Sequence, residues 1–363
     1  MPKKYHPKVV SQTNFLSKLY KKKDPNNSFK IIDLFAGIGG IRLGFKQEGC
    51  ITVFTSEWDK FAQETYISNF GDIPEGDITK IRESDIPEFD ILLAGFPCQP
   101  FSQAGLKKGL ADTRGTLFFD VARIINHHKP KAFLLENVKR FKTHDGGKTF
   151  LVVKEVLEGM GYKIFSEILN AKDFGLPQNR ERIYIVGFLG EVKFNFPIPP
   201  KTPVKLGDIL EPKVHDKYTI SDALWAGHQR RKKQHEKNGF GFGYCLFDRD
   251  SPYTSTISAR YYKDGSEILI SQNNKNPRKL TPREAARLQG FPEEFKVSPS
   301  DTQAYKQFGN SVAVPVVNAI AKEMIKTLNS HTLSSNQHSK INIEKIKKEK
   351  IKDAIKRLIP KKN

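Results

Sequence analysis

Apolar and polar residues alternate along the first half of the chain with two different periods. Continuous apolar runs at residues 31–35, 51–54 and 89–94 are typical of buried strands, and mixed stretches at 41–48 and 59–69 are typical of helices. The alternation continues with an expected helix at 118–127, a strand at 132–135, a helix at 150–157 and a strand at 182–188. Strands that alternate with helices predict an α/β fold with a doubly wound, mostly parallel sheet.

The pattern changes at residues 196–200, where the run Phe-Pro-Ile-Pro-Pro indicates a domain boundary. The chain then becomes irregular, basic and aromatic, with short β-like pieces such as residues 267–270. A clean helix is expected to follow, with Thr281 as its N-cap, Pro282 at its first position and Glu284 at its third. We therefore expect a second, smaller and irregular β-rich domain after residue 194.

The length of 363 residues allows a large core and a second module, and 38% of the residues are hydrophobic. Three widely spaced cysteines form neither a disulfide framework nor a cysteine-rich zinc site, so no metal is expected. No apolar run is long enough to span a bilayer, and the first residues lack the apolar segment of a signal peptide. These features predict a protein of the reducing cytoplasm, without a membrane partner.

The chain is strongly basic, with 60 Lys and Arg against 40 Asp and Glu and a formal net charge of +20. Basic residues gather near both ends, and a further run, Arg230-Arg231-Lys232-Lys233, lies in the irregular region. Such an excess favours a polyanionic partner, with nucleic acid ahead of a membrane surface.

A cysteine lies between two prolines just past the expected strand at 89–94, in the stretch Pro97-Cys98-Gln99-Pro100. A structural cysteine would normally lie inside such a strand. The prolines place this one on a turn instead, at the sheet edge where ligands and chemistry gather in open α/β folds. Cys98 is therefore a candidate nucleophile.

A glycine-rich turn, Gly37-Ile38-Gly39-Gly40, joins the first expected strand to the first expected helix, as in dinucleotide-binding folds. The phosphate fingerprint G-x-G-x-x-G fails because Arg42 stands at the third glycine position. This departure argues against a nucleotide diphosphate and against a dehydrogenase. A ligand with adenosine but no pyrophosphate fits better, and S-adenosylmethionine is such a ligand.

Acidic and aromatic residues near the expected strand ends fit an adenosine ligand. Asp33 lies within the first strand, Glu57 ends the second, where an acid suits ribose hydroxyls, and Asp77 is expected to follow the third. Trp58 is placed to stack on an adenine, with Phe35 on its other side. Each aromatic alone is as typical of a core, but the glycine turn and Glu57 together favour the ligand.

Five short segments in a fixed order resemble the DNA cytosine-C5 methyltransferases, in particular those of bacterial restriction–modification systems. The resemblance covers roughly residues 30–325, apart from the variable stretch at 195–278. The segments are Phe35-Ala36-Gly37-Ile38-Gly39-Gly40, Pro97-Cys98-Gln99, Glu136-Asn137-Val138, Gln178-Asn179-Arg180-Glu181-Arg182 and Gln307-Phe308-Gly309-Asn310-Ser311-Val312. Each segment is weakly specific alone, whereas all five in order are highly specific.

The resemblance implies methyl transfer from S-adenosylmethionine to C5 of a flipped-out cytosine through a covalent adduct. Cys98 is the expected nucleophile toward C6, and Glu136 the expected proton or hydrogen-bond donor at N3. Arg182 is expected to clamp the O2 of the base, and Arg180 lies on the same face if the segment is extended. A carboxyl group that donates must be protonated, so we expect a raised pKa for Glu136.

The resemblance also implies binding residues. Those for the cofactor are Phe35, Gly37, Gly39, Glu57, Trp58, Asp77, Ile78, Pro97, Asn310 and Ser311. Those for DNA are Ser102 and Arg114 in a mobile loop, the pair Thr256 and Ile257, and the basic residues Arg230, Arg231 and Arg260.

The implied organisation has a discontinuous catalytic domain. We expect a basic extension at 1–29, the catalytic and cofactor domain at 30–194 and 279–330, a target-recognition domain at 195–278 and a basic tail at 331–363. The expected partner is double-stranded DNA, bound by a monomer, and the expected functional partner is a cognate restriction endonuclease.

Three alternatives were weighed against this interpretation. A cytosine deaminase needs His-x-Glu and Pro-Cys-x-x-Cys zinc ligands, which are missing around Cys98. A tRNA cytosine-C5 methyltransferase of the same fold stays open, although the long basic module and the Pro-Cys-Gln form favour DNA. A catalytically silent DNA-binding protein is disfavoured because all the expected catalytic residues are present.

Overall fold

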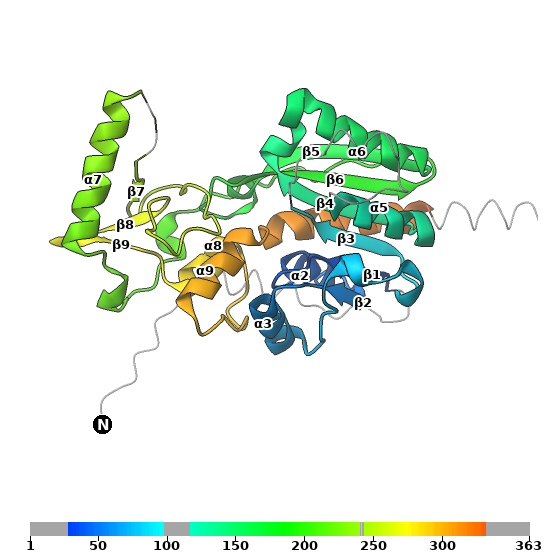
Figure 1. Cartoon of the computed structure of the whole chain (residues 1–363), viewed down its shortest axis with the longest axis horizontal. Helices are drawn as coiled ribbons and strands as arrows, with labels where there is room; N and C mark the ends of the chain where they lie inside the picture. Colours follow the sequence, from blue (N-terminus) through cyan, green and yellow to red (C-terminus); the bar gives the residue numbers. More distant parts are fainter. Residues whose placement is uncertain (1–27, 98–116, 240, 242, 332–363) are drawn as a thin grey trace, which may run out of the picture.

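The computed structural model describes residues 28–97, 117–239, 241 and 243–331, and it divides into a large and a small lobe (Figure 1). The large lobe is built on a six-stranded sheet in the order β2-β1-β3-β4-β6-β5. Its strands are β1 (Lys30–Leu34), β2 (Ile51–Ser56), β3 (Ile91–Gly95), β4 (Ala132–Val138), β5 (Tyr162–Asn170) and β6 (Glu181–Leu189). Its labelled helices are α2 (Gly40–Lys46), α3 (Lys60–Phe70), α5 (Leu117–His128) and α6 (Lys148–Gly159).

The sheet is mostly parallel because β6 alone runs against its neighbours β4 and β5. The pairs β1–β2, β1–β3 and β3–β4 are parallel, so their carboxyl ends meet at one edge. Ile31 enters the apolar cluster on one face, and Ile32 and Leu34 enter the cluster on the other. Parallel strands buried on both faces read as continuous apolar runs, which explains why the sequence predicted them well.

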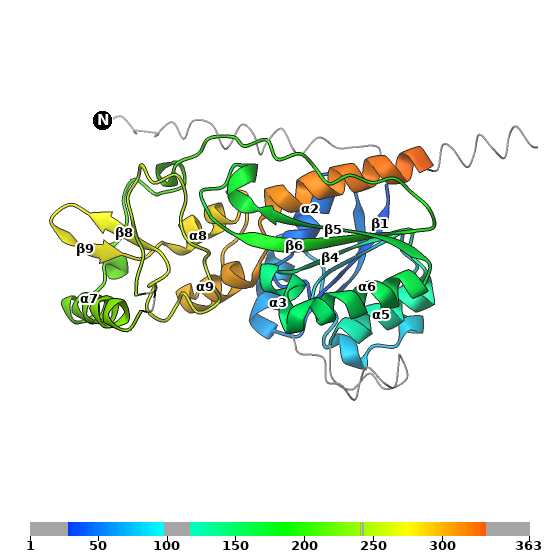
Figure 2. The same ribbon diagram turned by 90° about the horizontal axis from the view of Figure 1, so that it is seen from above.

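Helices cover both faces of this sheet (Figure 2). One face packs against α2 and a long helix at residues 314–331, through side chains such as Phe45, Val317 and Met324. The other face packs against α5 and α6, through side chains such as Ile124 and Val153. This arrangement is the expected doubly wound fold.

The small lobe carries a three-stranded sheet beside a helix (Figure 1). Its elements are α7 (Asp222–Lys237), β7 (Leu246–Phe247), β8 (Leu269–Gln272) and β9 (Lys275–Arg278). The chain returns through α8 (Pro282–Leu288) and α9 (Asp301–Asn310). A third apolar cluster joins the two lobes, since it contains Leu43 of the large lobe together with Ile257 and Tyr305.

The structure confirms the expected helix start at Thr281, whose hydroxyl accepts from the Glu284 amide while the Glu284 carboxylate accepts from the Thr281 amide. Several elements differ from expectation, among them β5 and α7. The strand β5 was not predicted, and α7 lies in a stretch expected to be irregular. Of its residues only His228 is buried, so α7 has no apolar stripe from which a helix could be inferred.

Asp77 was expected to follow a strand, and that is wrong. It caps the short 3₁₀ helix η2 (Ile78–Lys80) between α3 and β3. A bridge from Glu75 to Ser56 nevertheless brings this segment alongside the end of β2. In the described part of the chain, no helix has the length and apolar character needed to cross a membrane.

Candidate active site

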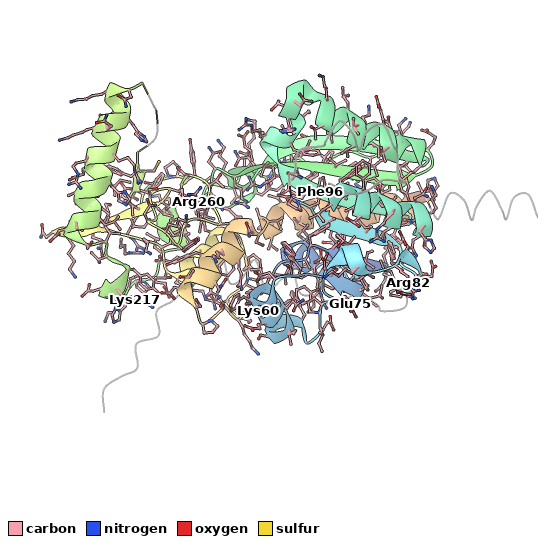
Figure 3. All side chains as sticks on the ribbon, in the orientation of Figure 1. Lys60, Glu75, Arg82, Phe96, Lys217 and Arg260 are labelled. Atoms are coloured by element: carbon pink, nitrogen blue, oxygen red, sulfur yellow. The ribbon has the colours of Figure 1, made fainter. Side chains whose placement is uncertain are left out.

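The site lies at the edge where β3 and β4 end. Cys98, Ser102 and Arg114 fall outside the described residues, and Pro97 is the last described position before them. The Asn137 side-chain amide donates to the Phe96 carbonyl at 2.9 Å, and both residues are buried. Asn137 therefore fixes the backbone that leads into Cys98. Figure 3 shows Phe96 on the side of the large lobe that faces the small lobe.

Glu136 lies opposite Gly95 in the β3–β4 pair, one strand away from the segment that carries Cys98. Its Oε1 lies 3.2 Å from Nε of Arg182, which is near the start of β6. Burial raises the pKa of Glu136, and the charges of Arg182 and Arg180 oppose that rise only in part. The site thus favours a carboxyl that keeps its proton to a higher pH than an exposed glutamate.

Arg180 does not share the role of Arg182. Its guanidinium donates to main-chain carbonyls of Ile257 at 3.1 Å, Gly309 at 3.1 Å and Ser311 at 2.5 Å. Burial, reinforced by the charge of Arg182, lowers the pKa of Arg180 to about 9. The guanidinium of Arg180 is therefore held by main-chain carbonyls, and its predicted catalytic role stays a prediction.

The glycine-rich turn after β1 has an unusual backbone. Phe35, Gly37 and Gly39 all have positive φ, of 54°, 55° and 81°. Positive φ is strained for a side chain such as Phe, and strain of this kind gathers at ligand sites. A Cβ at Gly37 would meet nothing within 4 Å, so the space beside the turn is open to a ligand.

Glu57 lies against this turn. Its Oε2 accepts from the Gly37 amide at 2.7 Å and its Oε1 accepts from the Asp59 amide at 2.8 Å. Burial raises the pKa of Glu57, although these amides lower it. Each carboxylate oxygen can accept a further bond, so Glu57 stays able to bind ribose hydroxyls.

A polar cluster lies beneath the turn. Arg42 donates to the Tyr66 hydroxyl at 2.8 Å, pairs with Asp72 at 2.5 Å and stacks over the Phe70 ring. Asp33 is fully buried, and among the described residues neither of its carboxylate oxygens has a side-chain hydrogen-bond partner. Burial raises the pKa of Asp33 to about 7 despite the nearby Arg42.

The expected adenine site is partly formed. Trp58 is 80% exposed, so its face is available to a ligand. Phe35 is partly buried and packs against the core, as does the buried Ile78. The Asp77 carboxylate accepts from the amide and hydroxyl of Thr79, and these bonds keep its pKa low.

The returning segment closes on the same turn. Asn310 ends α9 and is exposed, and Ser311 follows it. A Cβ built on Gly40 would come 2.6 Å from the Ser311 hydroxyl oxygen. A side chain at position 40 would therefore force the Ser311 hydroxyl to move, so Gly40 favours the close approach of these two segments, which are far apart in the sequence.

The expected DNA-contact residues fall into two groups. Arg260 is exposed in the small lobe (Figure 3), and Arg230 is exposed on α7. Arg231 instead pairs with Asp264 at 3.1 Å and contacts His228 at 2.7 Å. Arg231 is therefore paired within the small lobe while its side chain stays partly exposed, and its predicted DNA contact stays a prediction.

Thr256 and Ile257, which were expected to act together at the DNA, have different surroundings. The Thr256 hydroxyl donates to the Asn179 carbonyl at 2.6 Å. Ile257 is 0% exposed, and its amide donates to Gln178 while its carbonyl accepts from Arg180. A direct DNA contact by the Ile257 side chain is therefore wrong, because that side chain is part of the core.

Sequence reasoning missed three residues that hold the site together: Asn137, Gln178 and Gly309. All three stand inside the motif segments, which was the available signal, but only tertiary contacts give their roles. Within the described residues, no group of three or more His, Cys, Asp or Glu side chains is arranged to hold a metal ion.

Comparisons with known proteins give the family of the chain. The model of the family "C-5 cytosine-specific DNA methylase" matches residues 29–326. The Type II methyltransferase M.SsoII of Shigella sonnei is 64% identical over 315 residues, covering 84% of this chain and 83% of that protein. The Type II methyltransferase M.NlaX of Neisseria lactamica is 62% identical over 306 residues, covering 83% and 98%.

Solved structures support the fold. The S. pombe Dnmt2 methyltransferase superposes with a TM-score of 0.70 at 22% identity, covering 83% of this chain and 99% of that one. A putative DNA modification methyltransferase encoded in an E. coli prophage gives a TM-score of 0.61 at 22% identity, covering 83% and 100%. At such identities the likeness concerns the fold alone.

Proposed function

We propose a reaction and residue roles for this chain from the premise that it belongs to the family of C-5 cytosine-specific DNA methylases. It is a Type II DNA cytosine-C5 methyltransferase. We propose that it methylates C5 of a flipped-out cytosine in a short, specific duplex sequence, through a Cys98–C6 adduct. The observation that carries this proposal is the partly buried ion pair of Glu136 and Arg182, beside the strand that leads into Cys98.

The residues at the glycine-rich turn fit S-adenosylmethionine. The turn leaves open space beside Gly37, Glu57 can accept from ribose hydroxyls, and Trp58 offers an exposed face to adenine. Asp77, Ile78, Pro97, Asn310 and Ser311 are the further residues that would hold the cofactor. When bound, the cofactor supplies an electrophilic methyl group on a sulfonium.

The chain supplies the means to make C5 nucleophilic. The Cys98 thiolate adds to C6, and the electron pair of the C5–C6 double bond moves toward C5 and N3. The protonated Glu136 donates to N3, and Arg182 donates to O2, so both oppose the developing negative charge. After methylation a water accepts the C5 proton, the N3 proton returns to Glu136, the C5–C6 double bond re-forms, and the C–S bond breaks to return the thiolate.

DNA recognition is assigned to the small lobe and the loop after Cys98. A cytosine in a duplex cannot present both ring faces, so it must leave the stack. Arg230, Arg260 and Thr256 from the small lobe, with Ser102 and Arg114 from the loop, contact the DNA. The division into a catalytic domain at 30–194 and 279–330 and a recognition domain at 195–278 follows from these roles.

The biological role proposed is protection of host DNA from a cognate restriction endonuclease, by a monomer that acts in the cytoplasm. The relatives named above are Type II methyltransferases, and this supports the proposal of a restriction–modification role. Methylation that blocks cleavage at the recognised site is the expected consequence.

The deciding experiment incubates the purified chain with unmethylated plasmid and S-adenosylmethionine, followed by bisulfite sequencing, with Cys98→Ala as the matched control. Protected cytosines within one short recurring sequence, absent with the variant, are expected. Methyl incorporation into tRNA but not DNA would move the substrate to RNA. Equal protection by the variant would overturn the covalent role of Cys98.

A further inference from the structure

Three distant segments of the chain meet at one buried arginine. Arg180 binds the carbonyl of Ile257, in the segment that precedes the small sheet. The same guanidinium binds the carbonyls of Gly309 and Ser311, in the segment assigned to the cofactor. Arg180 is only 2% exposed, so water cannot replace these acceptors.

Further bonds hold the segment around Ile257 against residues 177–180. The Thr254 amide donates to the Pro177 carbonyl at 2.9 Å, and the Asn179 amide donates to the Thr254 carbonyl at 2.8 Å. The Thr256 hydroxyl adds a bond of 2.6 Å to the Asn179 carbonyl. These contacts resemble a short strand pair, and they fix residues 254–257 along the segment that carries Arg180.

Gln178 extends the junction toward α8. Its Oε1 accepts from the Ile257 amide at 3.1 Å, and its Nε2 donates to the Leu288 carbonyl at 3.0 Å. Gln289 in turn donates to the Phe308 carbonyl at 2.7 Å. Both amide side chains are 0% exposed, so this is a fully buried polar network.

The same segments also approach closely through Gly309. A Cβ built there would come 2.3 Å from the carbonyl carbon and oxygen of Ser258. Real Cβ atoms do not approach backbone so closely, so only glycine allows the end of α9 to pack directly on the segment after Ile257. The junction is therefore rigid as well as hydrogen-bonded.

We infer that Arg180 is a positioning residue that couples DNA binding by the small lobe to cofactor binding at Ser311. This inference rests on the proposed function, in which Thr256 contacts DNA and Ser311 the cofactor. A shift of the recognition segment that lengthens the bond to Ile257 displaces the guanidinium that also holds Gly309 and Ser311. Each ligand thus favours the arrangement that the other needs, and such a coupling is reciprocal.

The coupling role requires the planar guanidinium group of Arg180. A planar guanidinium can reach several carbonyls at fixed angles, whereas a lysine ammonium is a compact point charge on a flexible stem. Arg180→Lys keeps the positive charge beside Glu136 and loses the simultaneous contact with Ile257, Gly309 and Ser311. The substitution therefore separates the coupling from the electrostatics of the site.

The test measures binding of S-adenosylhomocysteine by titration calorimetry, with and without saturating duplex that carries the site found by bisulfite sequencing. The natural chain should bind it about tenfold more tightly with DNA present. Arg180→Lys should reduce that ratio to less than about twofold. Thr256→Val is a milder substitution that removes one hydrogen bond of the same junction, and it should give an intermediate ratio. It replaces Arg180→Lys in the test if the lysine variant does not fold.

The control is Arg278→Lys, because Arg278 is similarly buried but its guanidinium bonds to Glu284 and to the Lys279 carbonyl instead. Its ratio should match that of the natural chain. Two outcomes overturn the inference and leave the methyltransferase function intact. One is a ratio of affinities that stays unchanged in both Arg180→Lys and Thr256→Val, and the other is a natural chain whose affinity does not change with DNA. Failure of the natural chain to methylate DNA overturns the proposed function itself.

Discussion

In the proposed mechanism, the carboxyl of Glu136 must carry a proton while negative charge builds on the target ring. Burial raises its pKa, so the protonated form persists to higher pH than for an exposed glutamate. Activity should therefore fall as pH rises through that pKa, because the ionised carboxylate cannot donate to N3. The ion pair with Arg182 works against this protonation and limits how far the pKa rises.

Glu136→Gln tests the donor role. Glutamine keeps a hydrogen-bond donor but has no proton to give, so kcat should fall by about a hundredfold or more. The alkaline fall in kcat/KM should be absent from the variant, and the affinity for S-adenosylhomocysteine should be retained. Steady-state rates across pH provide the measurement, with the exposed Glu167→Gln as control. A variant rate within about threefold of the natural rate would contradict the assignment.

Asp33 predicts a dependence of stability on pH. Its pKa is about 7 in the folded chain and near 3.8 without the fold, so between these values only the folded state holds the proton. The free energy of unfolding of the natural chain therefore falls as pH rises across this window. The contribution of the protonated Asp33 to stability is complete only below the lower pKa. An asparagine at position 33 cannot ionise, so the free energy of unfolding of that variant does not fall for this reason.

Asp33→Asn should thus be stabilising relative to the natural chain, by an amount that grows from about pH 4 to about pH 7 and reaches at most about 4 kcal/mol. Urea unfolding at several pH values measures the difference. The exposed Asp145→Asn is the control, with no such trend expected. A difference that is constant with pH would show that Asp33 is ionised in the folded chain.

At the scale of the element, β6 depends on a glycine at its centre. Gly187 faces Phe133 of β4, and a Cβ there would come 2.1 Å from that buried ring. A ring with 0% exposure has no room to move away, so overpacking is the expected result.

Gly187→Ala should lower the free energy of unfolding by about 1–3 kcal/mol, since it strains the pairing that carries Arg182 beside Glu136. Denaturant unfolding gives the value. Gly159→Ala at the end of α6, where a Cβ would meet nothing within 4 Å, is the matched control and should be neutral or stabilising. Equal stability of the two variants would mean that β4 and β6 move apart at little cost to accommodate the added methyl group.

At the scale of the whole molecule, a net charge of +20 predicts DNA affinity that weakens steeply with salt. For six to ten phosphate contacts, affinity should fall by roughly a thousandfold or more between about 50 mM and 200 mM salt. Fluorescence anisotropy with a labelled duplex measures this slope. A flat dependence would mean that the excess charge does not contact DNA.

Two neighbouring arginines of α7 make the salt experiment specific. Arg230→Ala should reduce the slope, because Arg230 is exposed. Arg231→Ala should leave the slope unchanged and lower the stability of the small lobe, because Arg231 is paired with Asp264. The opposite result would place Arg231 on the DNA.

The sequence alone determined the fold class and the kind of site. Buried parallel strands read as apolar runs, and the chemistry stands in contiguous segments such as Pro97-Cys98-Gln99 and Glu136-Asn137-Val138. A cap such as Thr281 is local too, so its residues predict it directly. These features need only the order of neighbouring residues, which is what a sequence records.

Only the tertiary structure decided which residue does which task. The sequence could not separate Arg180 from Arg182, because the contacts that distinguish them join Arg180 to carbonyls 77 and 131 residues away. It could not separate Arg230 from Arg231, or predict α7, because a polar helix has no apolar period and the pairing with Asp264 arises across the fold. Side-chain type fixes what a residue can do, whereas the packing of distant segments fixes which partner it meets.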